Sequence, residues 1–329
     1  MKYEFLILGS NSFSGSNFIK YLVQKNYRVI GISRSKRKKE LFFSLSKNKK
    51  KFFLFKKLNI NNDQKKIINL INKYKPKYIV NFAAQGMVNE SWKEPLQWYQ
   101  TNLMSMIALI ESLKNKKFIK KFIQFSTPEV YGSTSKKWIT ENENFKPSTP
   151  YASSRAACDR YFLNLNEQSN FPIVFTRAAN VYGPEQDLYR IVTKTFTHLI
   201  FNKKIYVDGE GNSFRSFIHI NDVCEALNII IKKGKIKETY HISTKRIISI
   251  KNLVYKILKI VNTKKKLIVL IKKDRLNKDK YYMLNSKKLR KLGWRDKINL
   301  NNGLIDTFKW ILKNKNKIRL LNTNYIHKK

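Results

Sequence analysis

The first half of the chain alternates short apolar runs with amphipathic ones, and this alternation limits the possible folds more than any other feature. The apolar runs predict buried strands at residues 3–9, 27–33, 78–84, 120–127 and 172–183. The segments between them carry apolar residues at helical spacing and predict helices at 16–26, 63–74, 95–115 and 151–167. Strands that alternate with helices form a parallel sheet covered on both faces. We therefore expect an α/β fold with a doubly wound parallel sheet.

A glycine-containing loop, GSNSFSGSNF, follows the first predicted strand. Gly9 can form the tight turn that leaves the strand, and Gly15 is small enough for the next helix to pack closely on the strand. Ser12 stands where a middle glycine is expected, but its side chain is small and can hydrogen-bond a phosphate. The N-terminus of the following helix favours a pyrophosphate. The sequence thus predicts a Rossmann-type dinucleotide loop that includes Phe13 and Ser14.

The residues after the second predicted strand indicate which dinucleotide is bound. This strand ends GISRSKR, with Arg34 and no acidic residue before Glu40. An acidic side chain here would bind the ribose 2′-hydroxyl of NAD, whereas arginine can pair with the 2′-phosphate of NADP. We therefore expect NADP to be preferred, with NAD as the alternative.

The stretch STPYASSRAACDRY places Tyr151 four residues before Arg155 at the start of a predicted helix. Residues i and i+4 share one helix face, so the cation can lower the pKa of the tyrosine. A tyrosine that acts as a base at neutral pH needs its pKa lowered by about 3 units, or 4 kcal/mol. Arginine is bulkier than the lysine ordinarily found in such a pair. Taken alone, the stretch also fits a surface Tyr–Arg pair.

Further motifs extend this pattern along the chain. FSTPEVYGS places Ser126, Thr127 and Glu129 at the carboxyl end of a strand, where sites in doubly wound sheets lie. Downstream come TRAANVYGPEQDLYR, GEGNSFRSFIHINDV and DRLNKDKYYMLNSKKLRKLGW. In order and spacing, these motifs resemble the extended short-chain dehydrogenase/reductase family, particularly its nucleotide-sugar dehydratases and epimerases. The resemblance covers about residues 3 to 312.

The resemblance implies roles for residues on both sides of the site. On the cofactor side, LNIN matches the adenine-contacting turn, with asparagine in place of the usual aspartate, and NFAAQ matches the segment that passes the ribose. The implied cofactor residues are Gly9, Ser12, Phe13, Ser14, Gly15, Arg34, Asn59, Ile60, Ala83, Ala84, Gln85, Tyr151 and Arg155. Asn102 matches a structural asparagine behind the active site. The implied substrate residues are Gln85, Ser126, Thr127, Asn180, Arg190, Arg215 and Arg275.

Glu129 distinguishes between the reactions of this family. The resemblance implies that Thr127 holds the sugar 4-oxygen, that Tyr151 is the base and that Arg155 stands at the lysine position. In the 4,6-dehydratases the matching motif carries a glutamate that removes the C5 proton after oxidation at C4. We therefore expect a nucleotide-sugar 4,6-dehydratase, with dTDP-glucose as the first candidate substrate and GDP-mannose as the second. Pro128 departs from the pattern, because one dehydratase group has an acid there that protonates the leaving 6-hydroxyl.

Three alternatives remain open from the sequence. A 4-epimerase or decarboxylase of the same family needs the same 4-keto step. A catalytically inactive nucleotide-binding sensor is suggested by Ser12, Pro128 and Arg155 together. A nucleic-acid binder is suggested only by the net charge of +45. No dedicated nucleic-acid element is present, and the lysine-rich runs at 34–40 and 46–53 are expected to be solvated loops.

The remaining expectations concern organisation and location. We expect residues 1–180 to form the NAD(P)-binding domain with the catalytic residues, 181–315 a smaller, mainly substrate-binding α/β domain, and 316–329 a loosely held basic tail. Two cysteines, histidines without metal-ligand spacing and no long apolar run predict a cytoplasmic protein without metal or membrane contact. The resemblance implies a homodimer through the helices that carry Asn102 and Tyr151.

Overall fold

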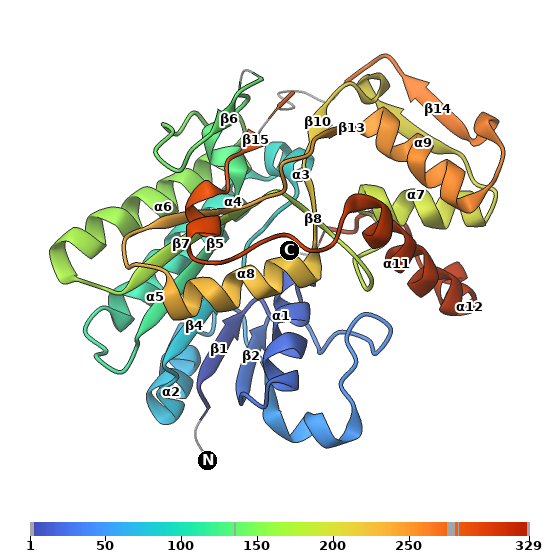
Figure 1. Cartoon of the computed structure of the whole chain (residues 1–329). Coiled ribbons are helices and arrows are strands. Elements are labelled where there is room, and N and C mark those ends of the chain that lie inside the picture. Colours follow the sequence, from blue (N-terminus) through green and yellow to red (C-terminus); the bar gives the residue numbers. More distant parts are fainter. Residues whose placement is uncertain (1–2, 135, 275–279, 282, 328–329) are drawn as a thin grey trace.

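A seven-stranded parallel sheet forms the centre of the molecule, in the order β12-β7-β5-β4-β1-β2-β3 (Figure 1). The computed structural model describes residues 3–134, 136–274, 280–281 and 283–327. The strands of the sheet are β1 (Phe5–Leu8), β2 (Val29–Ser33), β3 (Phe53–Lys57), β4 (Tyr78–Asn81), β5 (Lys121–Ser126), β7 (Ile173–Ala178) and β12 (Thr239–Ile242). The order reverses between β1 and β4, which is the position where open α/β sheets bind ligands.

Both faces of the sheet are covered by helices, as the alternation of strands and helices predicts. Phe5 and Ile7 of β1 face one buried cluster with α1 and α8, whereas Leu6 and Leu8 face the opposite cluster with α2, α5 and α6. The helices of this part are α1 (Phe13–Gln24), α2 (Gln64–Tyr74), α3 (Val88–Lys93), α4 (Pro95–Tyr99), α5 (Ser105–Leu113), α6 (Pro150–Ser169) and α8 (Ile220–Lys233).

The later part of the chain forms a third apolar cluster beside the sheet. Its helices are α7 (Ile191–Ile200), α9 (Ile250–Val261), α11 (Leu300–Lys313) and α12 (Lys315–Arg319), whereas Leu289 of α10 (Lys287–Lys291) packs into the first cluster, with α1 and α8. Short strands pair here as β8 (Asn180–Tyr182) with β11 (Phe217–His219), β9 (Ile205–Asp208) with β14 (Ile268–Ile271), β10 (Phe214–Arg215) with β13 (Ile248–Ser249), and β6 (Trp138–Ile139) with β15 (Met283–Leu284). β12 and α8 also come from beyond residue 180, yet β12 is an edge strand of the large sheet and α8 packs on one of its faces.

Single-turn and irregular helices complete the chain. They are the 3₁₀ helices η1 (Lys47–Phe52), η3 (Pro128–Tyr131), η4 (Gly209–Gly211) and η5 (Lys265–Leu267), and the π-helix η2 (Gln100–Met104). The π turn interrupts the segment that the sequence predicts as one helix over 95–115. The structure thus has α4, η2 and α5 in succession there.

Two further predictions are corrected by the structure. The run at 46–53, expected to be a solvated loop, forms η1 and the start of edge strand β3. The lysines of this run lie in η1, and Phe53, the first residue of β3, is partly buried against Phe43. The run at 172–183, expected to be one strand, divides into β7 in the large sheet and β8, which pairs with β11.

Candidate active site

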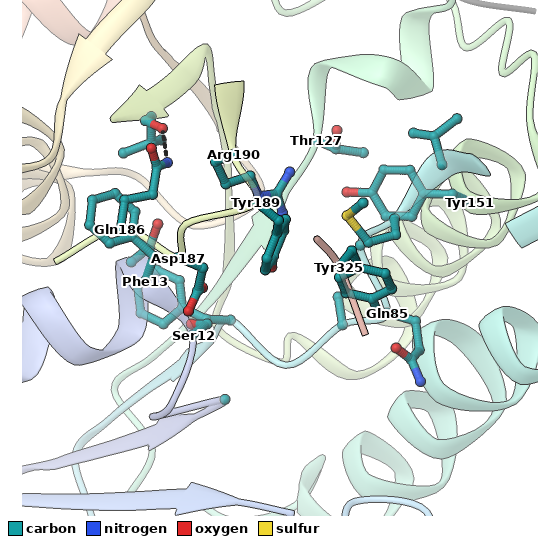
Figure 2. A pocket seen from close by; sticks show the side chains of 18 of the residues that line it. Ser12, Phe13, Gln85, Thr127, Tyr151, Gln186, Asp187, Tyr189, Arg190 and Tyr325 are labelled. Carbon is teal, nitrogen blue, oxygen red and sulfur yellow. Dashed lines mark hydrogen bonds between the residues drawn. The ribbon is translucent and has the colours of Figure 1, made fainter. Parts of the chain in front are cut away.

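One cavity of about 870 Å³ brings the predicted site residues together at the carboxyl ends of β1, β4 and β5 (Figure 2). The predicted residues that line it are Gly9, Ser12, Phe13, Ser14, Arg34, Asn59, Ile60, Ala83, Ala84, Gln85, Ser126, Thr127, Glu129, Tyr151, Arg155, Asn180, Arg190 and Arg215. Gly15 lies in the first turn of α1 and is not among the lining residues. Arg275 lies outside the described residues.

The loop after β1 has a geometry that only glycine allows at two positions. Gly9 has φ +74°, and a Cβ there would lie 2.6 Å from the backbone nitrogen of Ala83. A Cβ on Gly15 would lie 2.5 Å from the carbonyl oxygen of Gly9. Ser12 is the N-cap of α1, and its Oγ accepts a hydrogen bond from the Gly15 N–H at 3.0 Å. The loop and the helix N-terminus therefore form a close-packed cradle that fits a dinucleotide pyrophosphate.

Two neighbouring turns border this cradle. Arg34 reaches across the cavity, where its Nη2 lies 3.5 Å from Oε1 of Gln85. Asn59 accepts a hydrogen bond from the Asn61 N–H at 3.0 Å, which fixes the turn after β3. Asn11, which the sequence analysis did not identify, donates to Oγ of Ser35 at 3.0 Å and so joins the loops after β1 and β2.

Tyr151 lies in the first turn of α6, which begins there for local reasons. Thr149 caps the helix by accepting from the Ala152 N–H at 3.1 Å, and Pro150 occupies the first helical position. Tyr151 is partly buried and lines the cavity with Thr127. Figure 2 shows the Thr127 side chain beside the hydroxyl end of the Tyr151 ring.

The electrostatics of Tyr151 differ from the expectation. Burial raises the pKa of Tyr151 above its ordinary value of 10.0, and the Glu129 carboxylate raises it further. Three influences lower the pKa, but together they are weaker than the two that raise it: the charge of Arg155, hydrogen bonding with Thr127 and the charge of Arg190. Arg155 thus lowers the pKa of Tyr151, as the helical spacing predicts, but burial and Glu129 outweigh this effect in the protein without cofactor.

Arg155 is almost completely buried, with 1% of its surface exposed. Its Nη2 donates to the carbonyl oxygen of Phe125 at 2.6 Å, which anchors the guanidinium against β5. Its Nε and Nη1 have no hydrogen-bond partner within the described part of the chain. Buried donors that lack a partner are costly, so they fit hydroxyl groups of a bound ligand. The alternative of a surface Tyr–Arg pair is wrong.

Glu129 lies beside this pair, at the start of η3. Pro128 takes the first position of η3, where its missing N–H costs nothing, and Thr127 accepts from the Glu129 N–H at 3.3 Å. The Glu129 side chain is half-buried and its charge acts on Tyr151. The sequence Thr-Pro-Glu therefore brings a hydroxyl and a carboxylate to the phenol.

Asn102 supports the site from behind, inside the π-helix. Its Oδ1 accepts from the Gln85 N–H at 2.8 Å, and its Nδ2 donates to the Gln85 carbonyl oxygen and to Ser154 Oγ, both at 3.1 Å. π turns often mark functional sites in helices. Here the turn connects the β4 loop to the helix that carries Tyr151.

The opposite wall comes from the later part of the chain. Asn180 lies in β8, Arg215 in β10, and Arg190 immediately before α7. Nη1 of Arg215 donates to the carbonyl oxygen of Phe214 at 2.7 Å, and the Arg190 guanidinium lies 5.2 Å from the Tyr189 ring centroid. This wall therefore carries an amide and two cations, a combination that suits a diphosphate.

Ser126 is bonded to a buried ion pair. Its Oγ donates to Oδ2 of Asp159 at 2.6 Å, and Asp159 pairs with Arg177 at 2.9 Å. Arg177 also donates to the hydroxyl of Tyr131, which in turn contacts Nε2 of His241 at 2.8 Å. The hydroxyl proton of Ser126 is therefore directed into the protein.

Several lining residues were not identified from the sequence, among them Asn11, Gln186, Asp187, Tyr189, Tyr325 and Ile326. Proximity to Arg190 in the DLYR motif could have indicated Asp187 and Tyr189. Two ion pairs hold the segment 185–187 against the first part of the chain. Lys20 pairs with Glu185 at 2.6 Å, and Lys38 pairs with Asp187 at 3.4 Å.

The described residues contain neither a membrane-spanning helix nor a metal-ligand cluster. No helix there combines the length and apolar character needed to cross a membrane. Across the same residues, no group of three or more histidine, cysteine or acidic side chains is arranged to hold a metal ion.

The fold and the cavity define an enzyme of the extended short-chain dehydrogenase/reductase class, because a dinucleotide loop and a tyrosine–cation pair meet at one sheet edge. The chain belongs to the GDP-mannose 4,6-dehydratase family, whose sequence model matches residues 6–307. It is 33% identical to the human dTDP-D-glucose 4,6-dehydratase over 251 residues, which cover 72% of this chain and 69% of the relative.

Solved structures are similar over nearly the whole chain. A dTDP-glucose 4,6-dehydratase from Bacillus anthracis in complex with NAD superimposes with a TM-score of 0.86 and 29% identity, covering 95% of this chain and 98% of that one. A UDP-glucose 4-epimerase from Thermotoga maritima with UDP-glucose gives a TM-score of 0.86 and 26% identity, covering 94% and 99%. Both dehydratases and epimerases are thus structural neighbours.

Proposed function

We propose that the protein is an NAD-dependent 4,6-dehydratase of a nucleoside-diphosphate hexose. The observation that carries the proposal is the grouping of Thr127, Glu129 and Tyr151 around one cavity, with the charge of Glu129 acting on the phenol. An epimerase needs the phenol and the hydroxyl, whereas a second proton acceptor is needed to remove a proton from C5.

The cofactor side of the cavity supports a dinucleotide. The loop from Gly9 to Gly15 would hold the pyrophosphate, Asn59 and Ile60 the adenine, and Arg155 the ribose hydroxyls through its two unpartnered donors. When bound, NAD supplies an acceptor for the C4 hydride and returns this hydride at C6. NAD is proposed rather than NADP because the similar dehydratase structure contains NAD. The preference for NADP expected from Arg34 has no such support.

The residues of the chain account for the proton transfers. Thr127 would hold the 4-oxygen of the sugar while Tyr151 takes the proton of the 4-hydroxyl group. The resulting ketone makes the C5 hydrogen acidic, and Glu129 would remove it. The C6–O bond then breaks, and the 6-hydroxyl leaves with a proton as water. Because Pro128 has no proton to give, we propose that Glu129, once protonated, also supplies this proton. When the hydride is added at C6, C5 regains a proton that originates from solvent.

The proposed substrate is dTDP-glucose, and GDP-mannose is the second candidate. The first is supported by the similar human and bacterial dTDP-glucose 4,6-dehydratases, and the second by the name of the matching family. The diphosphate would be bound by Asn180, Arg190 and Arg215, with Arg275 as a further predicted contact outside the described residues.

The test is mass spectrometry of the protein incubated separately with dTDP-glucose, GDP-mannose, CDP-glucose and UDP-sugars in the presence of NAD. Loss of the mass of one water from one sugar nucleotide is the expected result and identifies the substrate. Products of unchanged mass but altered chromatographic mobility would instead support a 4-epimerase. Pro128, which removes the usual acid, is the observation that favours this second candidate.

Assembly and location also belong to the proposal. We propose a homodimer, which is supported by exposed apolar side chains on the helices around Asn102. We propose a cytoplasmic location, which is supported by two buried cysteines, Cys158 and Cys224, neither of which is in a disulfide. No specific nucleic-acid partner is proposed.

A further inference from the structure

The C-terminal segment 321–327, here named the C-terminal strap, reaches the mouth of the active-site cavity. α12 lies at the edge of the molecule, whereas the C-terminus is marked near its centre (Figure 1). Two residues of the strap, Tyr325 and Ile326, line the cavity. The sequence predicts a loosely held tail here, but the described part of the tail is held by specific contacts.

One end of the C-terminal strap is attached to α7. Oγ1 of Thr323 lies 2.9 Å from Nε2 of His198, and Nζ of Lys194 donates to Oδ1 of Asn324 at 3.2 Å. α7 belongs to the apolar cluster of the later part of the chain. This end is therefore fixed to the wall that carries the proposed diphosphate-binding residues.

The other end is attached to α4, on the side of the large sheet. Nε2 of His327 lies 2.8 Å from Oε1 of Gln97, and the His327 ring stacks on Trp98 with centroids 5.2 Å apart and planes 12° apart. Trp98 is fully buried, so it gives the histidine a rigid base. The strap thus joins both sides of the cavity and crosses its opening.

Tyr325 lies between these two attachments and extends into the cavity, between Tyr189 and Gln85 (Figure 2). Its ring centroid is 5.1 Å from that of Tyr189, with the planes at 72°. The charges of Arg34, Glu90 and Arg190 are close enough to act on its hydroxyl. Arg34 and Glu90 follow β2 and β4, so Tyr325 faces the cofactor half of the site.

We propose that the C-terminal strap is a binding element of this site and that Tyr325 contacts the bound dinucleotide. The inference rests on the proposed function, because it needs NAD to occupy the cavity. An aromatic ring with a hydroxyl group suits a ligand that presents flat bases, ribose hydroxyls and phosphates, since it offers both an apolar face and a donor. The last residues of the chain therefore help determine affinity for the cofactor.

The test measures NAD⁺ affinity by titration calorimetry on the full-length wild type and three variants. Tyr325→Ala is expected to weaken binding about ten-fold, equivalent to about 1.4 kcal/mol. Tyr325→Phe, which retains the ring, should lie between Tyr325→Ala and the wild type. Leu320→Ala is the matched control, because Leu320 is 86% exposed and does not line the cavity. All variants should unfold at the wild-type temperature.

A fourth variant tests the attachment while leaving every lining side chain in place. His327→Ala removes the contacts with Gln97, with Trp98 and with the Tyr325 hydroxyl, which lies 3.2 Å from Nδ1 of His327. NAD⁺ is therefore expected to associate and dissociate faster in stopped-flow fluorescence. If wild type binds NAD⁺ but Tyr325→Ala binds it equally well, the inference is overturned and the proposed function stands. A change only in the KM of the sugar nucleotide would overturn the dinucleotide assignment. Wild type that fails to bind NAD⁺ would contradict the proposed function itself.

Discussion

Tyr151 is partly buried, and its environment works against its proposed role as a base. Desolvation and Glu129 favour the protonated form, while Arg155 and Thr127 favour the phenolate. The protein alone therefore holds the proton, and an additional positive charge is needed to release it. Oxidised nicotinamide carries such a charge, whereas the reduced form does not, so the redox state of the cofactor would control the proton state of the phenol.

The first prediction concerns this titration. In the cofactor-free protein, Tyr151 should remain protonated up to its ordinary pKa of 10.0, because burial raises the pKa. NAD⁺ should lower the pKa and NADH should not. The measurement is NMR of ¹³C-labelled tyrosine, with the signal assigned by comparison with Tyr151→Phe. Arg155→Lys retains the charge and should behave as wild type; equal pKa values with NAD⁺ and NADH would rule out this account.

The second prediction separates the two proton acceptors. Glu129→Gln keeps the size of the side chain but removes its basicity, so oxidation at C4 should continue while exchange at C5 stops. Incubation with substrate in deuterated water should therefore give no deuterium at C5, and dehydration should fall by at least about 100-fold, the usual contribution of a general base. Undiminished deuterium uptake would remove Glu129 from the mechanism.

At the scale of elements, the site depends on polar chains that run between strands and helices. The π turn at Asn102 joins the β4 loop to α6, and the buried chain from Ser126 through Asp159, Arg177 and Tyr131 joins β5 to His241 in β12. Each member of such a chain limits the positions of the next. Positioning of Tyr151 and Thr127 therefore depends on strands β5, β7 and β12 of the large sheet together with α6.

The third prediction follows from the end of this chain. Burial first, and then the charges of Arg177 and Lys288, hold the pKa of His241 well below the usual 6.5. The unfolded chain binds a proton near 6.5 and the folded chain does not, so this contribution to stability is present above 6.5 and is lost as the pH falls below it. Each pH unit below 6.5, down to the pKa of the folded state, should lower the free energy of unfolding by about 1.4 kcal/mol.

The measurement is urea unfolding of wild type and His241→Gln between about pH 7 and pH 5. The free energy of unfolding of the variant should depend less on pH, because unfolding of the variant takes up about one proton fewer than unfolding of the wild type. Facing groups that also titrate, chiefly Glu141 and Tyr131, have raised pKa values and remain in both proteins, so their contributions cancel in the comparison. Parallel curves would show that His241 does not titrate on unfolding.

At the scale of the whole molecule, the sequence predicts those features of the fold and the site that depend on residues close together along the chain. Gly9 and Gly15 are required by their own loop, and Tyr151 and Arg155 meet because they are one helical turn apart. β3 was missed because its lysines suit an exposed sheet edge and mask the strand pattern. The raised pKa of Tyr151 and the position of Tyr325 depend on tertiary packing, which no short stretch of sequence expresses.

The fourth prediction concerns assembly. Leu96 of α4 is 81% exposed and Met104 of η2 is 54% exposed, close to Trp92, which is 48% exposed. Burying this surface against a second copy would supply the apolar contact of a homodimer. Light scattering should give a dimer for wild type and a monomer for Leu96→Glu combined with Met104→Glu. Leu320→Glu, equally exposed but on the C-terminal segment, should leave the dimer intact; a wild-type monomer at high concentration would contradict the prediction.

The attachment of His327 to Gln97 and Trp98 has a practical consequence for handling the protein. Trp98 is fully buried beneath the His327 ring, so a polyhistidine segment fused beyond this residue would compete with His327 for the tryptophan platform. Kinetic constants measured before and after removal of such a tag should therefore differ, and those measured without the tag describe the enzyme free of this competition.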